Sequence, residues 1–145
     1  MKGVAGIHHI TAITGDPQKN LDFYEGFLGQ RLVKRTVNFD DPRSYHFYFA
    51  DAYGKPGTLL TFFYWPGTPT GIKGAGEVSA IRYFIGKDGA DFWKKRAKEF
   101  KVPCGFPANA NDIEMRMQQG FSVFVMNWGD AGFKTVDLGR KTAGR

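Results

Sequence analysis

The sequence predicts an α+β fold in which two βαβββ modules form one domain, with curved mixed sheets around a cleft for a small molecule. A strand, a helix and three further strands follow one another twice, offset by about 71 residues when Gly15 is aligned with Gly86. Between the two sets lies Pro66–Gly76, whose four glycines and two prolines are typical of a linker. We therefore expect a first module at 1–66, a linker at 67–76 and a second module at 77–145.

The first module is the more clearly patterned half. Residues 6–14 alternate β-branched and other side chains and are expected to form the first strand. Asp16 and Pro17 then supply an N-cap and a first helical position, and Gly29 stands where a C-terminal cap is expected. Turn-forming residues separate three further expected strands, Arg31–Phe39, Tyr45–Ala50 and Thr58–Trp65.

The second module is predicted from the same order of elements. Val78–Ile85 is expected to be a strand, and Asp88 is expected to cap a helix from about Gly89 to Phe100. The remaining strands are expected at Val102–Phe106, at about Met115–Met126 and at Phe133–Leu138. Each module alone would leave one sheet face uncovered, so the two are expected to share a core.

The charge pattern argues against a nucleic-acid partner. The net charge is +6, and the densest basic cluster lies late in the second predicted helix, after Asp88 and Asp91. This order complements the helix macrodipole, so we interpret the cluster as a solvated helix face. The cluster is formed by Lys94, Lys95, Arg96, Lys98 and Lys101.

Hydropathy and cysteine content favour a cytoplasmic protein without a membrane partner. No apolar segment approaches the roughly 18 residues that a membrane-spanning helix requires, and the first residues do not resemble a secretory signal. Cys104 is the one cysteine, so an internal disulfide cannot form, and we expect it to be an unreactive thiol.

His8 and His9 are the first candidates for chemistry. Neutral imidazole is the commonest metal ligand, and a strand holds it rigidly. Successive side chains on a strand point to opposite faces, so the two histidines are not expected to bind one ion together. Both faces of this strand are mixed in character, so alternation alone does not choose between them. His46, in an aromatic strand, is expected in the core or at its rim.

Two segments resemble a known family. GIHHITAITGDPQKNLDFYEGFLGQRLVKRT and YHFYFADAYGKPGTLLTFFYWPG are similar to the N-terminal part of hydroquinone-type ring-cleaving dioxygenases of the vicinal-oxygen-chelate superfamily, often labelled glyoxalase, bleomycin-resistance or dioxygenase proteins. The likeness continues more loosely through Glu77–Phe100. It implies Fe(II) bound by two histidines and one carboxylate, with oxygen inserted beside a phenolic hydroxyl. By this resemblance His9 would be a metal ligand, and His8 would line the site as a catalytic residue without binding the metal.

The chain departs from that pattern in its second half. Relatives of this type have about twice as many residues and take their other ligands from the last module, whereas Ala80 stands where a second histidine would match His9. Asp137, in the last predicted strand, is the candidate replacement for the family's terminal glutamate. His9 and Asp137 together are two protein ligands, one fewer than a facial Fe(II) site uses.

Three functions remain open at this point. The chain is expected to be a divalent-metal enzyme, with Fe(II) favoured, that acts on a small phenolic or other oxygenated substrate. The alternatives are a metal-free binding module of the drug-resistance type, or half of a split enzyme whose partner supplies the missing ligands. Because open, curved module sheets need a partner to complete a cleft, we also expect a homodimer.

Overall fold

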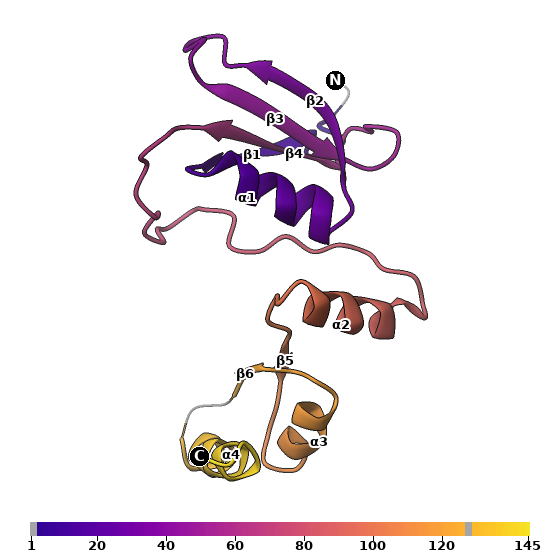
Figure 1. Cartoon of the computed structure of the whole chain (residues 1–145), viewed down its shortest axis with the longest axis vertical. Coiled ribbons are helices and arrows are strands. Elements are labelled where there is room, and N and C mark those ends of the chain that lie inside the picture. The colour runs from indigo at the N-terminus through magenta and orange to yellow at the C-terminus, as the bar shows by residue number, and fades with distance from the viewer. Residues whose placement is uncertain (1–2, 127–128) are drawn as a thin grey trace. The chain divides into compact units, whose positions relative to one another are not determined.

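The computed structural model describes residues 3–126 and 129–145 and divides into two compact units, Met1–Ile81 and Arg82–Arg145. Each unit has its own helices and strands (Figure 1). Within the described ranges, no helix combines the length and the hydropathy needed to cross a membrane.

The first unit is a four-stranded mixed sheet with one helix. The sheet has the order β1-β4-β3-β2, with β1 parallel to β4 and the other neighbours antiparallel. All four strands lie within the predicted segments, and the βαβββ order of the first module is confirmed. Their bounds are His9–Thr14 for β1, Arg31–Val37 for β2, Tyr45–Ala50 for β3 and Leu59–Tyr64 for β4.

The helix between β1 and β2 begins and ends as predicted. It starts as the α-helix α1, Pro17–Leu21, and continues as the π-helix η1, Asp22–Phe27. The Asp16 carboxylate accepts hydrogen bonds from the amides of Gln18 and Lys19, both at 3.1 Å, which satisfies two otherwise unpaired donors of the first turn. After the helix, Gly29 adopts a φ of 67°, a conformation that glycine reaches without steric cost.

One face of this sheet carries the core. Four buried side chains from β3 and β4 form it, and Leu21 and Tyr24 of the helix pack against them. Tyr24 reaches two of these rings, with centroid separations of 5.3 Å to Phe49 and 4.7 Å to Phe62. Because side chains alternate along a strand, every second residue of the same strands lies on the opposite face. The four core residues are Phe47, Phe49, Leu60 and Phe62.

The second unit contains three helices and two short strands. The helix α2, Gly89–Glu99, confirms the predicted one, and α3 and α4 cover Ile113–Gln118 and Asp130–Thr142. The strands β5, Gly105–Pro107, and β6, Val123–Val125, pair in parallel. The α+β class is therefore confirmed, but the second predicted βαβββ order is not what the described residues form.

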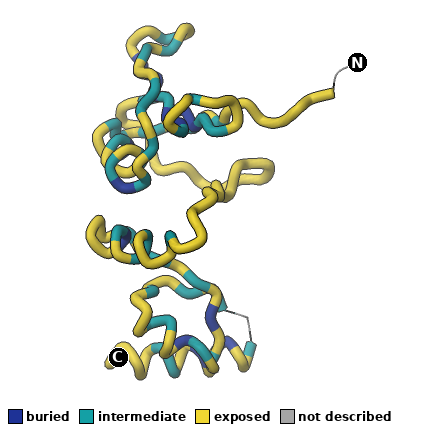
Figure 2. The backbone as a smooth tube through the Cα atoms, turned by 90° about the vertical axis from the view of Figure 1, so that its right-hand side faces the viewer, coloured by how far each residue is buried: buried dark blue, intermediate teal, exposed yellow. Residues whose placement is uncertain are grey.

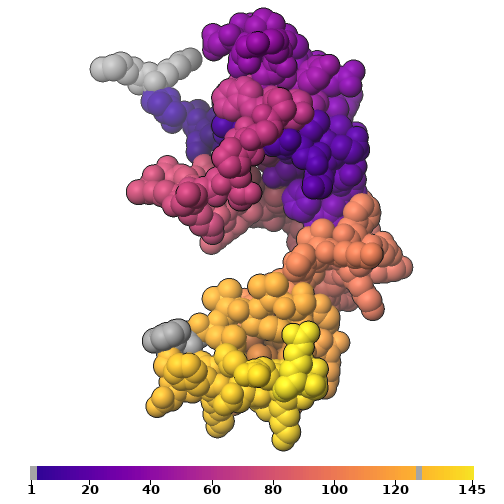
Figure 3. All heavy atoms as spheres, turned by 60° about the vertical axis from the view of Figure 1, so that its left-hand side comes forward, coloured from indigo at the N-terminus to yellow at the C-terminus, as the bar shows by residue number. Residues whose placement is uncertain are grey.

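The predicted strand Val78–Ile85 is wrong. The segment has no regular secondary structure, and residues 65–88 are exposed throughout (Figure 2). The space-filling view shows part of this segment projecting from the first unit (Figure 3). A strand must pair its backbone groups with a neighbour. The segments predicted to provide neighbouring strands form mostly helices instead. Alternating apolar residues alone were therefore insufficient to make Val78–Ile85 a strand.

The last two predicted strands are also corrected by the structure. Met115–Gln118 belongs to α3, since Met, Glu, Arg and Gln favour helices, and the ion pair between Asp112 and Arg116 (3.5 Å) spans one turn. Gly120, at a φ of 92°, separates this helix from β6. Phe133–Leu138 lies inside α4, which has Asp130 in its first turn and Arg140 and Lys141 in its last, as the helix macrodipole favours.

The stability of the first unit should depend on Phe49, whose side chain is 0% exposed in the core. We expect Phe49→Ala to lower the free energy of unfolding by about 3–5 kcal/mol, because it removes buried ring contacts and leaves a cavity. Urea unfolding followed by circular dichroism measures this. Phe39→Ala is the matched control, since Phe39 is 90% exposed. Equal losses in the two variants would contradict this placement of the core.

Candidate functional site

The candidate site is the sheet face of the first unit that the helix does not cover. On β1 the side chains of His9, Thr11 and Ile13 are exposed, whereas Ile10 and Ala12 pack against the core. The strand register extends this face across the sheet. We call it the open face and define it by His9, Thr11 and Ile13 of β1, Thr61 and Phe63 of β4, His46 and Tyr48 of β3, and Lys34 and Thr36 of β2.

His8 and His9 lie closer together than strand alternation predicted. His8 precedes β1, so alternation does not apply to this pair. Its carbonyl accepts a hydrogen bond from the amide of Gly57 (2.7 Å). The two imidazoles meet edge to face, with their Nδ1 atoms 3.1 Å apart and both side chains exposed. His9 is the one whose side chain belongs to the open face.

A chain of hydrogen bonds crosses the open face over three strands. The hydroxyl oxygens of Thr11 and Thr61 are 2.9 Å apart, and the Thr61 hydroxyl lies 3.0 Å from Nε2 of His46. Nδ1 of His46 lies 2.8 Å from the Tyr48 hydroxyl. Thr61 is 0% and His46 8% exposed, so both polar groups are buried with their partners in place.

His46 is buried as expected, but its polar role was not foreseen. The sequence of β3, YHFYFA, alternates polar and apolar side chains, and this alternation is the signal that separates His46 and Tyr48 from the core phenylalanines. The links to Thr61 and Thr11 depend on strand register, which the sequence pattern did not specify.

Burial and nearby charge favour the neutral form of the His46 imidazole. Burial lowers the pKa of His46, and the positive charges of His9 and Lys34 lower it further. The ammonium of Lys34 stands 5.4 Å from the ring centroid of Tyr48, the hydrogen-bond partner of His46. A neutral imidazole has one donor and one acceptor nitrogen, so the chain of hydrogen bonds has a direction.

Aromatic rings border this polar chain. The ring of Phe63 lies 4.0 Å from that of His46, and Trp65 stacks on Phe63 at 5.9 Å with an interplanar angle of 16°. Trp65 is 37% exposed. Small-molecule sites typically combine apolar and aromatic surface with a few placed polar groups.

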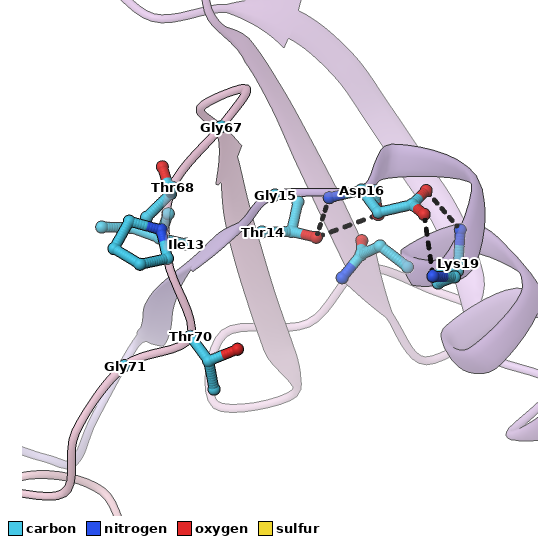
Figure 4. A pocket seen from close by; sticks show the side chains of 11 residues that line it. Ile13, Thr14, Gly15, Asp16, Lys19, Gly67, Thr68, Thr70 and Gly71 are labelled. Carbon is cyan, nitrogen blue, oxygen red and sulfur yellow. Dashed lines mark hydrogen bonds and ion pairs between the residues drawn. The ribbon is translucent and has the colours of Figure 1, made fainter.

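A separate cavity of about 720 Å³ lies where the end of β1, the start of α1 and residues 67–71 meet (Figure 4). Its polar groups mainly hold the start of the helix. The Thr14 hydroxyl donates to the Asp16 carbonyl (3.0 Å), and the Asp16 carboxylate pairs with Lys19 (3.4 Å). The open face, and not this cavity, is therefore the candidate site.

Asp137 is placed differently from the prediction. It lies on the helix α4 of the second unit, not on a strand, and its side chain is exposed. Across residues 3–126 and 129–145, no three His, Cys, Asp or Glu side chains lie together in a group able to hold a metal ion. The described residues therefore do not complete a facial Fe(II) site, which needs three protein ligands.

Comparison with known proteins identifies the family. Residues 6–141 match the Glyoxalase/Bleomycin resistance protein/Dioxygenase superfamily. The chain belongs to this superfamily. The resemblance stated from the two N-terminal segments is thus confirmed, and the open face lies within the matched residues.

Curated members of the superfamily share extensive sequence with this chain. A Bacillus subtilis protein named as a ring-cleaving dioxygenase, MhqO, is 56% identical over 102 residues, which cover 70% of this chain and 33% of MhqO. The chlorohydroquinone/hydroquinone 1,2-dioxygenase of Sphingobium indicum is 43% identical over 136 residues, covering 92% of this chain and 40% of that enzyme. The chain thus spans about a third of the length of such relatives.

Solved structures support the fold. A protein from Bacillus subtilis described as a dioxygenase is 55% identical and superposes with a TM-score of 0.66, covering 71% of this chain and 33% of that one. The fosfomycin resistance protein FosX of Listeria monocytogenes, solved with Mn(II), has a TM-score of 0.52 at 18% identity, covering 68% and 71%. The likeness to FosX supports the fold alone.

The lowered pKa of His46 predicts a pH dependence of stability. In the unfolded chain this imidazole takes up a proton near pH 6.5, whereas in the folded chain it stays neutral to a lower pH. The unfolded state then binds more protons, so stability falls as the pH drops from about 6.5 toward the folded-state pKa. Urea midpoints at pH 7.5 and pH 5.5 measure the loss.

His46→Gln should show a smaller loss between these two pH values, because its amide does not titrate. His8→Gln is the control for removing an exposed histidine, because His8 is not among the groups that lower the pKa of His46. If His46→Gln kept the full pH dependence of the wild type, the buried neutral state of His46 would be refuted.

Proposed function

We propose that this chain is a module of a metal-dependent ring-cleaving dioxygenase that acts on small phenolic substrates, with Fe(II) as the metal. The observation that carries the proposal is the exposed imidazole of His9 on the open face, two residues along β1 from the end of a buried hydrogen-bond chain. Relatives named as ring-cleaving dioxygenases and as a hydroquinone dioxygenase support the same chemistry.

In this proposal His9 is a metal ligand and His8 lines the site. The neutral nitrogen of an imidazole suits a divalent metal, and β1 holds His9 firmly because β1 pairs with β4 along its whole length. The described residues offer no complete ligand set, so the proposal takes the further donors from Asp137, from a second copy or from another chain. No reaction step through the metal is derived from this chain alone.

The substrate class follows from the side chains beside His9. The Thr11 hydroxyl can hydrogen-bond a phenolic oxygen, and the rings of Phe63 and Trp65 offer apolar surface to an aromatic ring. The positive charge of Lys34, on the same face, favours a ligand oxygen that carries negative charge. A cytoplasmic location would suit a chain with one free cysteine, Cys104.

The alternative is a metal-free binding module of the drug-resistance type. The incomplete ligand set among the described residues favours it. The two functions differ in one measurable property, since the binding module would take up a phenol without any metal bound at His9.

Metal binding tests the role of His9. We expect the wild type to bind Mn(II) only weakly, because affinity grows with the number of correctly placed donors. His9→Ala should abolish the specific binding and leave the fold intact, since the side chain is exposed. His8→Ala should lower any turnover of hydroquinone more than it lowers metal uptake. Calorimetric titration of the wild type and both variants provides the measurement.

Asp137→Asn extends the same titration to the second candidate donor. Further weakening would support Asp137 as a ligand. If His9→Ala bound Mn(II) as tightly as the wild type, the ligand assignment would be wrong and the binding module would become the better description.

We further propose a homodimer. The sheet has unpaired edges at β1 and β2, and apolar side chains such as Ile13, 50% exposed, lie on the open face. A stable interface should bury more than about 1,000 Å². Sedimentation equilibrium at tens of micromolar should therefore show the mass of two chains, and a single monomeric species would contradict the proposal.

A further inference from the structure

We propose that the hydrogen-bond chain on the open face has one fixed direction, from Tyr48 to Thr11, and that it turns the Thr11 hydroxyl outward as a donor to a ligand oxygen beside His9. The ligand class this favours is a phenolate or carbonyl oxygen on a small ring. This inference rests on the proposed function for its ligand. In it, His46, Tyr48 and Thr61 are positioning residues, because they act on the ligand only through Thr11.

The direction is decided at His46. A neutral imidazole donates from one ring nitrogen and accepts at the other, so only two arrangements are available. A phenol, with a pKa near 10, is a far stronger acid than an aliphatic hydroxyl and is the better hydrogen-bond donor. Tyr48 therefore donates to Nδ1 of His46 across 2.8 Å, and the proton of the ring lies on Nε2. The Lys34 ammonium near the Tyr48 ring strengthens this donor further.

The proton on Nε2 of His46 then orders the rest of the chain. It is donated to the Thr61 hydroxyl oxygen across 3.0 Å, so the hydrogen of Thr61 must point elsewhere. Thr61 is fully buried and cannot reach water, and the oxygen of Thr11 lies 2.9 Å away as its acceptor. An unmade bond at this buried hydroxyl would cost more than the bond itself contributes.

Thr11 is the end of the chain and the point where it meets a ligand. Its oxygen accepts from Thr61, which leaves its own hydrogen free on the exposed face of β1. His9 is two residues away on the same face, about 7 Å along the strand. A ring bound beside His9 would thus meet a donor at Thr11.

The tautomer of His46 tests the direction without any ligand. We expect ¹⁵N-correlated NMR of the imidazole groups to show His46 in the Nε2–H form in the wild-type chain. In Tyr48→Phe, which removes only the phenolic hydroxyl, the preference should shift toward the Nδ1–H form. A wild-type His46 in the Nδ1–H form would overturn the inference, as would a tautomer unaffected by loss of the Tyr48 hydroxyl.

Binding of hydroquinone, titrated without oxygen and followed by NMR, tests the consequence at Thr11. We expect Thr61→Val to weaken the affinity about threefold to tenfold, as loss of one net hydrogen bond would. Thr11→Val should weaken it equally, and the double variant should lose no more than either single variant. Thr70→Val is the matched control, because Thr70 is exposed and lies outside the open face.

The outcomes separate the inference from the proposed function. If Thr11→Val weakens hydroquinone binding and Thr61→Val does not, the hydrogen-bond chain does not orient the Thr11 hydroxyl, and the inference fails. If the wild type binds no hydroquinone, the proposed substrate class fails, and the His46 tautomer still decides the direction of the chain. Tyr48→Phe replaces Thr61→Val in the titration if the buried valine prevents folding.

Discussion

The parallel pairing of β1 with β4 is the constraint on which the candidate site depends. It places the first strand beside the last strand of the module, although some fifty residues separate Thr11 from Thr61 in sequence. The helix must then cross from the end of β1 to β2 over one face of the sheet, as the crossover between parallel strands requires. The other face stays uncovered, and His9 lies on it because the register of β1 puts Ile10 and Ala12 into the core.

Alternation along β3 and β4 gives the two faces opposite characters. Phe47, Phe49 and Phe62 supply a close-packed aromatic core, whereas His46, Tyr48 and Thr61 form a hydrogen-bonded layer between that core and solvent. Buried polar groups are costly unless each is paired, and this layer pairs its members with one another. The sheet is thus rigid at the positions where its open face presents chemistry.

The sequence was most informative where local rules decide the structure. The cap at Asp16, the left-handed Gly29 and the turns between strands act over a few residues, so the first module followed from the pattern. Val78–Ile85 failed because a strand needs partners that the local pattern does not reveal. Phe133–Leu138 failed because helix α4 satisfies its backbone within one segment. Asp137 therefore lies on a helix, and its proposed role stays a prediction.

The candidate site, too, could be predicted only where local sequence decides the structure. His9 could be proposed as a ligand from the sequence segment around it. The contacts that connect His46 with Thr61 and Thr11, by contrast, exist only because the strands pair. Nothing in the spacing of these residues along the chain places a threonine of β1 within 2.9 Å of one in β4. Strand register had to be known before the hydrogen-bond chain could be recognised.

The exposed segment 65–88 has an evolutionary consequence. It begins just after β4, where the sheet of the first unit is complete and its core is filled, and it contributes no buried side chain. Gene duplication, fusion or exchange with a break in this segment would therefore join intact modules without cutting a packed element. Relatives of which this chain covers only about a third would be expected to have been joined at such a segment.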